Sequence, residues 1–290
     1  MNPNRAPGSL PPSQLLLIAV ALLAACALPF FLSNYTTFQM TMVLVYAIAG
    51  LQGSGKSTLA AQLTAAAAGR GLKAIALSID DFYLGRRERL RLGRRIHPLL
   101  ATRGPPGTHD VVLAIEVLDA LREGRPVGLP RFDKIADRRL PPSRWPRVRG
   151  CDLLIFEGWC LKVPPQTRGE LVAPVNALER AEDTECIWRG YCNEALGRDY
   201  PALWARLPRL LFLQGPGFEV VPGWRWQQEQ TLQAAHPGRR TMSRAQVDHF
   251  VQLFERVSRQ ALRTLPMIAD RVVSLDPQRR PFGRPPPARV

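Results

Sequence analysis

The feature that most constrains this chain is the run GLQGSGKS at residues 50–57, which fits the pattern G-x-x-x-x-G-K-[ST] in full. The preceding residues 43–49 are apolar, as expected of a buried strand, and an alanine-rich helix is predicted over 56–68. A strand, a glycine loop and a helix in this order are typical of a phosphate-binding loop, or P-loop. A chance glycine turn before a helix is the alternative, and the correct flanking elements disfavour it.

Each residue type in this loop has a chemical role. Glycines let successive backbone N–H groups curl around a phosphate, and the start of the following helix adds partial positive charge. Lys56 supplies a compact cation for the β- and γ-phosphates of ATP, and the Ser57 hydroxyl is a candidate Mg2+ ligand. The other candidates for binding the nucleotide are Gly50, Gly53, Ser54, Gly55 and Thr58.

Further apolar runs alternate with helical patterns along the chain. Buried strands are predicted over 74–79, 153–156 and 210–213, and helices over 111–121 and around the apolar stripe at 247–261. Strands that alternate with helices predict a parallel sheet with helices on both faces. The predicted fold class is therefore α/β, a three-layer P-loop NTPase-type sandwich with a mostly parallel, doubly wound sheet and a helical lid.

The ends of the chain differ from this central region. Residues 1–14 and the Arg- and Pro-rich residues 277–290 are predicted to be disordered. Residues 15–33 are hydrophobic, and 15–32 are 18 residues without a charge, close to the roughly 20 that a membrane helix needs. A transmembrane helix, a signal-peptide core, a lipoprotein cleavage box at Cys26 and a buried helix are the alternatives. Membrane contact is expected only through residues 15–32.

The chain has a formal net charge of +15, which raises the question of a nucleic-acid partner. Its densest basic run is RRERLRLGRR at 86–95. No aromatic side chains interleave with this run to stack bases, and no recognition motif accompanies it. We therefore predict no nucleic-acid partner and interpret the run as a solvated basic face or an anion-attracting rim. The five cysteines contain no C-x-x-C pair, which favours a reducing, cytoplasmic compartment over a zinc site or disulfides.

Asp80 is the first acidic residue of the chain and follows the predicted strand 74–79. Open α/β sheets bind their ligands at the carboxyl ends of the strands, so this position is suited to a catalytic carboxylate. Strand alternation sends Asp80 and Asp81 to opposite faces, so only one of them is expected to face the phosphates. We choose Asp80 as the general base for an acceptor hydroxyl, with Asp81 as a helix cap. Tyr83 is expected to shape the acceptor pocket.

Glu157 ends the apolar run 153–156 and is followed by Gly-Trp. A carboxylate at that end of a buried strand is placed to bind Mg2+ or a water molecule on it. Helix capping is the alternative role for this residue. Together with Lys56 and Asp80, Glu157 completes the expected catalytic set.

Two further segments supply candidate acceptor-binding residues. In RGPPGTHD at 103–110, Arg103 could clamp a carboxylate through two parallel bonds and His109 could hydrogen-bond a hydroxyl. Asp110 is a candidate substrate ligand, or simply the cap of the helix over 111–121. Lys134, one of four lysines in the chain, is a candidate anion contact or a surface charge.

These segments together resemble the D-glycerate 3-kinases of bacteria, fungi and plants. The motifs that carry the resemblance are GLQGSGKS, SIDDFYL, RGPPGTHD, PRFDKIADRR, LIFEGWC, WRGYCNEAL and WRWQQEQ, in the expected order over about residues 43–276. These enzymes are P-loop kinases related to uridine kinases, pantothenate kinases and phosphoribulokinases. Arg138 stands where an acid is common in the family, which leaves the role of Asp137 open.

The resemblance implies a kinase domain over residues 43–276 that uses ATP and Mg2+ and phosphorylates a hydroxyl of D-glycerate or a similar small-molecule substrate. It implies that Asp80 accepts the hydroxyl proton, that Glu157 lies near Mg2+ and that Arg225 lies near the nucleotide. The residues that it assigns to the acceptor side are Arg103, His109 and Asp110.

Two other functions stay open at this point. The same scaffold could phosphorylate uridine or pantothenate, and a nucleoside kinase should show an aromatic pocket around Tyr83. A membrane-anchored ATP-binding regulator without an acceptor is the second, and it is disfavoured because no LSGGQ signature follows the P-loop. Residues 15–49 resemble the start of a branched-chain amino-acid ABC-transporter permease, which we interpret as a fused or mis-joined reading frame.

Overall fold

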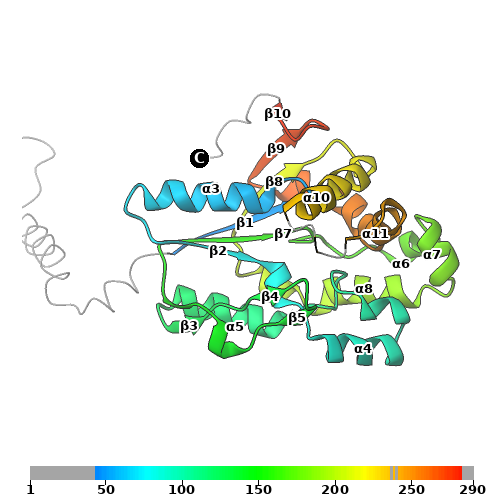
Figure 1. The fold of residues 1–290 in the computed structure, drawn as a ribbon, viewed down its shortest axis with the longest axis horizontal. Helices are drawn as coiled ribbons and strands as arrows, with labels where there is room; N and C mark the ends of the chain where they lie inside the picture. The colour runs from blue at the N-terminus through cyan, green and yellow to red at the C-terminus, as the bar shows by residue number, and fades with distance from the viewer. Residues whose placement is uncertain (1–42, 236–237, 239–240, 283–290) are drawn as a thin grey trace, which may run out of the picture. The chain divides into compact units, whose positions relative to one another are not determined.

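The computed structural model describes residues 43–235, 238 and 241–282, which are organised around a six-stranded β-sheet (Figure 1). The strands lie in the order β10-β9-β8-β1-β7-β2. Neighbouring strands are parallel, except that β9 and β10 are antiparallel. Their bounds are β1 (Leu44–Gly50), β2 (Ala74–Ser78), β7 (Leu153–Gly158), β8 (Arg209–Gln214), β9 (Arg271–Leu275) and β10 (Pro281–Phe282). The prediction of a mostly parallel α/β sheet is confirmed.

The register of the central strands places the functional edge of the sheet. β1 lies between β7 and β8, which explains why its sequence is apolar on both faces. Ile48 of β1 and Ser78 of β2 both lie beside Glu157 of β7. The carboxyl ends of these three strands therefore meet at one edge, and the P-loop begins there at Gly50.

Helices cover both faces of the sheet. Figure 1 shows α3 on one side of β1, β2 and β7, and α5 on the other. The bounds of the helices are α3 (Lys56–Ala68), α4 (Arg86–Arg95), α5 (Val111–Arg122), α6 (Arg168–Val172), α7 (Ala177–Glu182), α8 (Ile187–Arg198), α9 (Pro201–Trp204), α10 (Val221–Ala235) and α11 (Arg244–Ile268). This arrangement, with helices on both faces of the sheet, confirms the three-layer prediction.

Short elements complete the fold. Two small antiparallel pairs join β3 (Pro126–Gly128) to β6 (Arg147–Arg149) and β4 (Phe132–Asp133) to β5 (Arg138–Arg139). The 3-10 helices are η1 (Ile79–Phe82), η2 (Pro98–Ala101), η3 (Pro142–Arg144) and η4 (Phe218–Val220). The β4–β5 pair and η1 contact each other, which brings the PRFDKIADRR segment next to the end of β2.

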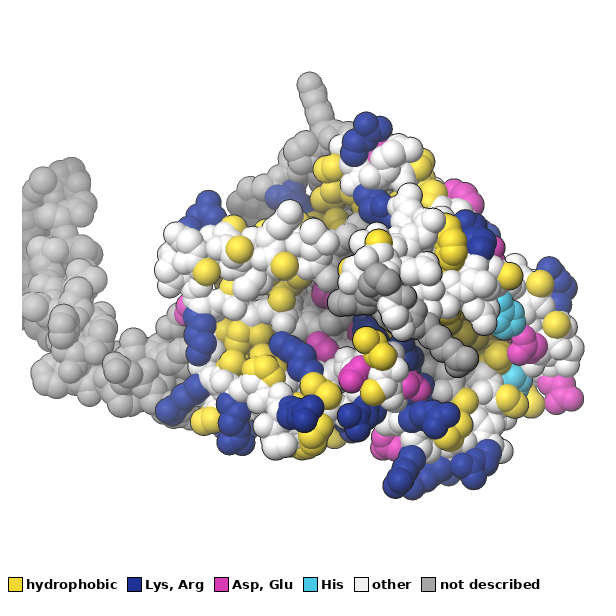
Figure 2. Space-filling model, in the orientation of Figure 1, with side chains coloured by type: hydrophobic (Ala, Val, Ile, Leu, Met, Phe, Trp, Pro, Cys, Tyr) yellow, Lys and Arg dark blue, Asp and Glu magenta, His cyan; other side chains and the backbone are white. Residues whose placement is uncertain are grey.

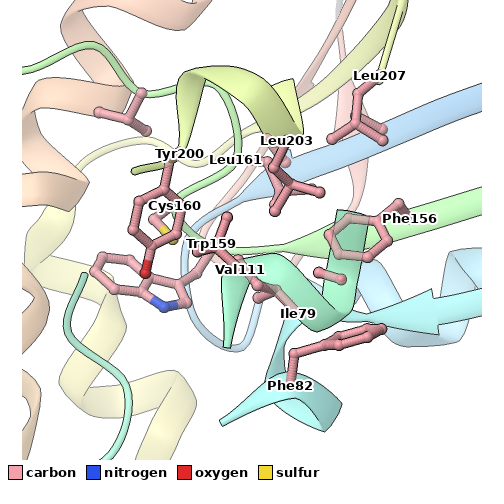
Figure 3. Close-up of a cluster of buried hydrophobic side chains, with 14 of the residues drawn as sticks. Ile79, Phe82, Val111, Phe156, Trp159, Cys160, Leu161, Tyr200, Leu203 and Leu207 are labelled. Atoms are coloured by element: carbon pink, nitrogen blue, oxygen red, sulfur yellow. The ribbon is translucent and has the colours of Figure 1, made fainter. Parts of the chain in front are cut away.

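Two of the apolar clusters in the core lie on opposite faces of the sheet. On one face Phe156 of β7 belongs to the same buried cluster as Leu118 of α5. On the other face Ile48 and Ile155 pack with Ala60 of α3. Figure 3 shows the first cluster, where buried side chains from β7, η1 and α9 meet. Burying each large aliphatic or aromatic side chain contributes roughly 1.5–3 kcal/mol, so these two clusters hold the strands at fixed positions.

The structure differs from the sequence prediction at the end of β2. The strand stops at Ser78 rather than at residue 79, and η1 follows immediately. The Ser78 side chain accepts a hydrogen bond of 3.3 Å from the Asp80 backbone N–H, and this local bond competes with extension of the strand. The expectation that Asp80 and Asp81 alternate along a strand is therefore wrong.

The basic run at 86–95 forms α4, and one of its arginines is not solvated. Figure 2 shows Lys and Arg side chains gathered over this helix at the lower edge of the molecule. Arg89, however, is only 1% exposed. Its guanidinium donates to the Ala101 carbonyl at 2.9 Å and to Asp137 at 2.7 Å. The interpretation of the whole run as a solvated face is wrong at Arg89, which is a buried structural cation.

The C-terminal expectation also needs correction. Residues 277–282 are ordered: they make the turn into β10, whose Pro281 pairs with Leu275 of β9. The Asp276 carboxylate holds this turn by accepting backbone N–H groups of Gln278 and Arg280 at 2.9 and 2.8 Å. The Arg- and Pro-rich composition predicted disorder. Composition alone does not show that Asp276 accepts the backbone hydrogen bonds that hold this turn.

The expectations for residues 1–42 and 283–290 lie outside the described residues, and with them the apolar segment 15–33 and most of the permease-like stretch. In the part of that stretch that is described, residues 44–49 belong to β1. No helix of the described residues is long and apolar enough to cross a bilayer. The helical lid stays a prediction.

Candidate active site

The P-loop has the backbone geometry of an anion cradle. Gly53 and Gly55 have φ angles of 77° and 90°, a region that other residues avoid. A Cβ at Gly53 would also lie 2.8 Å from the Cβ of Trp224. Ser54 is buried, and its Oγ has no hydrogen-bond partner among the described residues. The loop backbone and this unpaired hydroxyl suit a bound phosphate, which brings its own acceptor oxygens.

Lys56 lies at the start of α3 and is 8% exposed. Its ammonium donates a hydrogen bond of 2.9 Å to the Leu51 carbonyl, across the loop. Burial lowers the pKa of Lys56, while the carboxylates of Glu157 and Asp80 oppose that shift. A bound phosphate would stabilise this buried ammonium, because it would supply the negative charge that the single carbonyl partner lacks.

Ser57 and Glu157 form the candidate metal position. The Ser57 hydroxyl donates to Glu157 Oε1 at 2.9 Å. The described residues hold no cluster of three or more His, Cys, Asp and Glu side chains that could enclose an ion. A hydroxyl and one carboxylate fit Mg2+, which is commonly bound by few protein ligands together with waters and substrate phosphates. Thr58 is exposed in the same turn of α3.

Asp80 lies in η1 at the end of β2, and both of its carboxylate oxygens are engaged. Lys134 donates to Oδ2 at 2.6 Å, and the Tyr83 hydroxyl donates to Oδ1 at 2.8 Å. Burial raises the pKa of this carboxyl, but Lys134 and Tyr83 outweigh burial, so the pKa lies below its usual value. Asp80 is therefore ionised at neutral pH, as a group that must accept a hydroxyl hydrogen has to be.

Asp81 has a structural role instead. Its carboxylate accepts the Phe132 backbone N–H at 3.1 Å and an Arg131 guanidinium N–H at 3.3 Å. Burial raises its pKa, with only partial compensation from these partners. The expected helix-capping role is wrong: Asp81 attaches the β4–β5 segment to the end of β2, and so places Lys134 beside Asp80.

His109 is brought to Tyr83 by an isolated antiparallel bridge between the two residues. The imidazole stacks on the Tyr83 ring, with centroids 4.9 Å apart and planes 28° from parallel. Its Nδ1 lies 2.6 Å from the Tyr200 hydroxyl. Burial lowers the pKa of His109 to about 4, and the nearby Asp80 carboxylate opposes this shift. Tyr200 had no motif around it and was not predicted as a site residue.

Two other candidates are engaged in ion pairs. Asp110 caps α5 by accepting the Leu113 N–H at 3.1 Å, and its second oxygen accepts from Arg139 at 2.8 Å. The capping alternative for Asp110 is thus confirmed. Arg103 donates to Asp137 at 2.6 Å, so Asp137, whose role was open, binds the guanidinium of Arg103.

Proteins similar to this chain include kinases. No family model matches the chain. The chain is 33% identical over 221 residues to the uncharacterized kinase mug58 of Schizosaccharomyces pombe, covering 71% of this chain and 76% of that protein. It is 29% identical over 224 residues to the chloroplastic D-glycerate 3-kinase of Arabidopsis thaliana. The chain belongs to the D-glycerate 3-kinase family of P-loop kinases.

The alignment with the plant kinase covers 73% of this chain but 46% of that protein. The solved structure of the Cryptococcus neoformans D-glycerate 3-kinase superposes with a TM-score of 0.69 at 26% identity, covering 83% of this chain and 89% of that one. The resemblance drawn from the motifs is therefore confirmed, and so is the assignment of an ATP-dependent phosphotransferase.

One residue near the nucleotide loop of this kinase escaped sequence analysis. Arg279, in the β9–β10 turn, donates to the Gly53 carbonyl at 2.6 Å, and its guanidinium lies 5.0 Å from the centroid of the Trp224 ring. Trp224 in turn donates to the Pro277 carbonyl at 2.7 Å. The sequence did not indicate this role, because the Gly53 carbonyl that accepts from Arg279 lies 226 positions away.

Arg225, the residue expected near the nucleotide, follows Trp224 on α10. Its guanidinium pairs with Glu229 and lies 5.9 Å from the centroid of the Phe250 ring on α11. This places the side chain between two helices, while Trp224 contacts the P-loop. The role of Arg225 at the nucleotide stays a prediction.

Proposed function

We propose that this kinase transfers the γ-phosphoryl group of ATP to a hydroxyl of D-glycerate, giving 3-phosphoglycerate, with Mg2+ as the metal. The observation that carries the proposal is the meeting of three groups at the carboxyl edge of the sheet. These are the Lys56 ammonium, the Ser57–Glu157 pair and the Asp80 carboxylate. Each of them serves one part of a phosphoryl transfer.

The P-loop binds the donor. Backbone amides of residues 53–57 hold the phosphate oxygens. Lys56 exchanges the Leu51 carbonyl for a phosphate oxygen when ATP binds. Ser57 and Glu157 hold Mg2+, which when bound neutralises charge on the β- and γ-phosphates. Buried and fixed charges stabilise the transferring group because they need no reorganisation during the step.

Asp80 orients the acceptor. A bond forms between the acceptor hydroxyl oxygen and the γ-phosphorus, the bond from that phosphorus to the β–γ bridging oxygen breaks, and the hydroxyl proton passes to Asp80. ADP is the leaving group. A carboxylate with a lowered pKa is a weak base, and this suits a loose transition state in which the hydroxyl loses its proton late.

The surroundings of Asp80 suit a small anionic acceptor. Lys134 lies within 2.6 Å of Asp80, and Arg103 lies 5.7 Å from the centroid of the Phe132 ring that borders Tyr83. A nucleoside acceptor would need a free aromatic face. The Tyr83 ring is covered by His109 and by the edge of Phe132 and is 5% exposed, so it does not offer one.

The cellular setting follows from the donor. ATP transfer to a metabolite draws on cytoplasmic ATP, and Cys151, Cys160, Cys186 and Cys192 are free thiols. We therefore place the reaction in the cytoplasm. A regulator that hydrolyses ATP without an acceptor has no use for the Asp80–Lys134–Tyr83 arrangement.

The test is ADP release measured with D-glycerate, L-glycerate, uridine and pantothenate in turn, with and without Mg2+. We expect D-glycerate to raise the rate well above the others and chelation of Mg2+ to abolish it. Equal stimulation by uridine, or ADP release that ignores every acceptor, would refute the assignment.

A further inference from the structure

A cavity lies between α8, α11 and the segment 103–110. Pro106 lines it from that segment, Leu196 from α8, and Leu253 and Val257 from α11. About 20 Å3 of its volume is open to the centre of a water molecule, so it has room for a few heavy atoms. Among the described residues that line it, none belongs to the P-loop or to the proposed catalytic set.

One polar atom in the wall of this cavity lacks a partner. Trp188, at the start of α8, lines the cavity and is 3% exposed, and its Nε1 has no hydrogen-bond partner among the described residues. Its backbone N–H donates to the Asp183 carboxylate at 2.7 Å, which fixes the residue at the start of the helix. An indole N–H can only donate, and buried donors are normally paired. The unpaired indole therefore indicates an acceptor atom on a ligand in the cavity.

The two guanidinium groups in the lining are already paired. Arg189 pairs with Asp183 at 2.9 Å. Arg256 pairs with Glu179 at 2.6 Å. Both carboxylate side chains are fully buried, so each cation is neutralised inside the protein. An anion that entered the cavity would therefore find no uncompensated positive charge, and this excludes an anionic ligand.

The amide side chains of the lining have partners as well. Asn193 accepts the Gln166 backbone N–H at 2.6 Å and donates to the Gln166 carbonyl at 2.9 Å. Gln260 donates to the Pro164 carbonyl at 3.3 Å. In the described lining, Trp188 Nε1 is thus the one buried side-chain nitrogen or oxygen without a partner. A buried water needs about two to four polar partners, so an apolar molecule with one acceptor atom fits the cavity better than water.

The cavity lies directly behind the segment that carries candidate acceptor-binding residues. Gly104 and Gly107 of this segment have φ angles of 120° and 88°. A Cβ at Gly104 would lie 2.5 Å from the Phe254 ring of α11, and a Cβ at Gly107 would lie 2.6 Å from the Tyr191 ring of α8. The segment therefore packs closely against both helices. A molecule in the cavity would limit how far the segment can move away from the active site.

We propose that this cavity binds a small, mostly apolar molecule that carries one hydrogen-bond acceptor, such as a ketone, ester or ether oxygen. This oxygen accepts from Trp188 Nε1–H, and the apolar part packs on Leu253 and Val257. Because the bound molecule fills the space behind Pro106, it holds the segment 103–110 in place and favours binding of the phosphoryl acceptor. The binding site stands apart from the proposed function, whereas the effect on the acceptor rests on it.

The binding test uses acetone as the probe and 15N NMR of the tryptophan-labelled full-length kinase. Trp188→Phe identifies the Trp188 indole signal by removing it. We expect this signal to move downfield and to saturate as acetone is added. Trp159 and Trp204 are the controls, because their Nε1 atoms are also buried and unpaired among the described residues but neither lines this cavity. Equal shifts of all three signals without saturation would overturn the site.

A second test fills the cavity from its wall. Cys192 lines the cavity and is 4% exposed. Cys192→Met should abolish the saturating shift, because the longer side chain occupies the space. Cys186→Met makes the same change outside the lining and should leave acetone binding intact. If Cys192→Met does not fold, Val257→Ile adds one methylene to the same wall and should weaken binding. Undiminished acetone affinity in a folded wall variant would overturn the location.

Kinetics test the link to the acceptor. Acetone that saturates the Trp188 signal should lower the KM for D-glycerate at least about twofold and leave the KM for ATP unchanged. D-glycerate should in turn strengthen acetone binding, which the NMR titration measures without turnover. Cys192→Met should show neither effect. An unchanged KM for D-glycerate at saturation would overturn the effect on the acceptor. Lack of acceptor-dependent ADP release in the wild type would instead refute the proposed function, and the NMR titration would still judge the site.

Discussion

Ser57 and Glu157 are 100 positions apart in the chain, yet the Ser57 hydroxyl donates to Glu157 Oε1 at 2.9 Å. The contact exists because β1 and β7 are parallel neighbours, so the loop after β1 begins next to the last residues of β7. It joins the two side chains that we propose as the protein ligands of Mg2+.

Glu157→Gln should therefore lower kcat by at least about 100-fold, because the amide removes a fixed negative charge beside the metal. The Mg2+ concentration that gives half-maximal ADP release should rise in the same variant. Asp152→Asn, next to the other end of β7, is the control. Asp152 accepts the Lys73 N–H at 2.7 Å, far from the P-loop, and its replacement should leave the Mg2+ dependence unchanged.

Lys56→Ala should reduce kcat by about 1,000-fold, since it removes the cation that neutralises the transferring phosphate. The thermal midpoint should not fall, because burial already disfavours this ammonium and its deletion removes that cost. Lys73→Ala removes an exposed lysine bonded to the Arg149 carbonyl and should keep full activity. Substantial turnover in Lys56→Ala would contradict the assigned role.

Asp80→Asn and Asp81→Asn should separate catalysis from stability. Asp80→Asn should lower kcat at least about 100-fold while the KM for ATP is preserved, because only the proton acceptor is lost. Asp81→Asn weakens the bond to the Phe132 N–H and should lower the free energy of unfolding by about 1–3 kcal/mol with kcat nearly unchanged. The reverse pattern would show that the wrong carboxylate has been chosen.

Asp137 should make stability depend on pH. Burial raises its pKa, but Arg89 and Arg103 outweigh burial, so the folded-state pKa lies below 3.8. The pairing therefore stabilises the fold above the unfolded pKa, and this stabilisation is lost as the pH falls through the folded pKa. Asp137→Asn should lower the unfolding free energy by about 1–3 kcal/mol near neutral pH, and the difference should shrink on acidification. Urea unfolding over a descending pH series measures it, with Asp199→Asn, whose carboxylate pairs with the exposed Arg198, as control.

Arg279→Ala should raise the KM for ATP, by up to about tenfold, without changing the KM for the acceptor. The guanidinium holds the Gly53 carbonyl and packs on Trp224, so its loss frees the P-loop backbone that must bind phosphate. Arg280→Ala is the neighbouring control, because Arg280 pairs with Asp276 on the exposed side of the turn. Equal effects from both variants would show that only the turn itself matters.

The parts of the site that could be predicted from sequence are those built from consecutive residues. The P-loop is a local backbone structure, so its glycines, Lys56 and Ser57 identified it with its strand and helix. Glu157 was predicted as a site residue because a carboxylate at the end of a buried strand lies at the edge of the sheet. The family could be inferred because its motifs keep their order along the chain.

Other features depended on partners distant in sequence. Arg89 and Arg279 were assigned to a solvated run and a disordered tail, but each is held by acceptors from other segments. Asp81 was taken for a cap because its true partner, the Phe132 N–H, lies 51 positions away.

By itself, the sequence determined the α/β class, the P-loop and the identity of the kinase family, because hydrophobic periodicity and glycine patterns act over a few residues. Only the tertiary structure decided what the charged and aromatic side chains do. It separated Asp80 from Asp81 by their partners, and it joined His109 to Tyr200 across 91 positions. The physical reason is that a pKa, a tautomer and a buried ion pair depend on which groups the packed chain brings within a few ångströms, and neighbours in sequence do not report this.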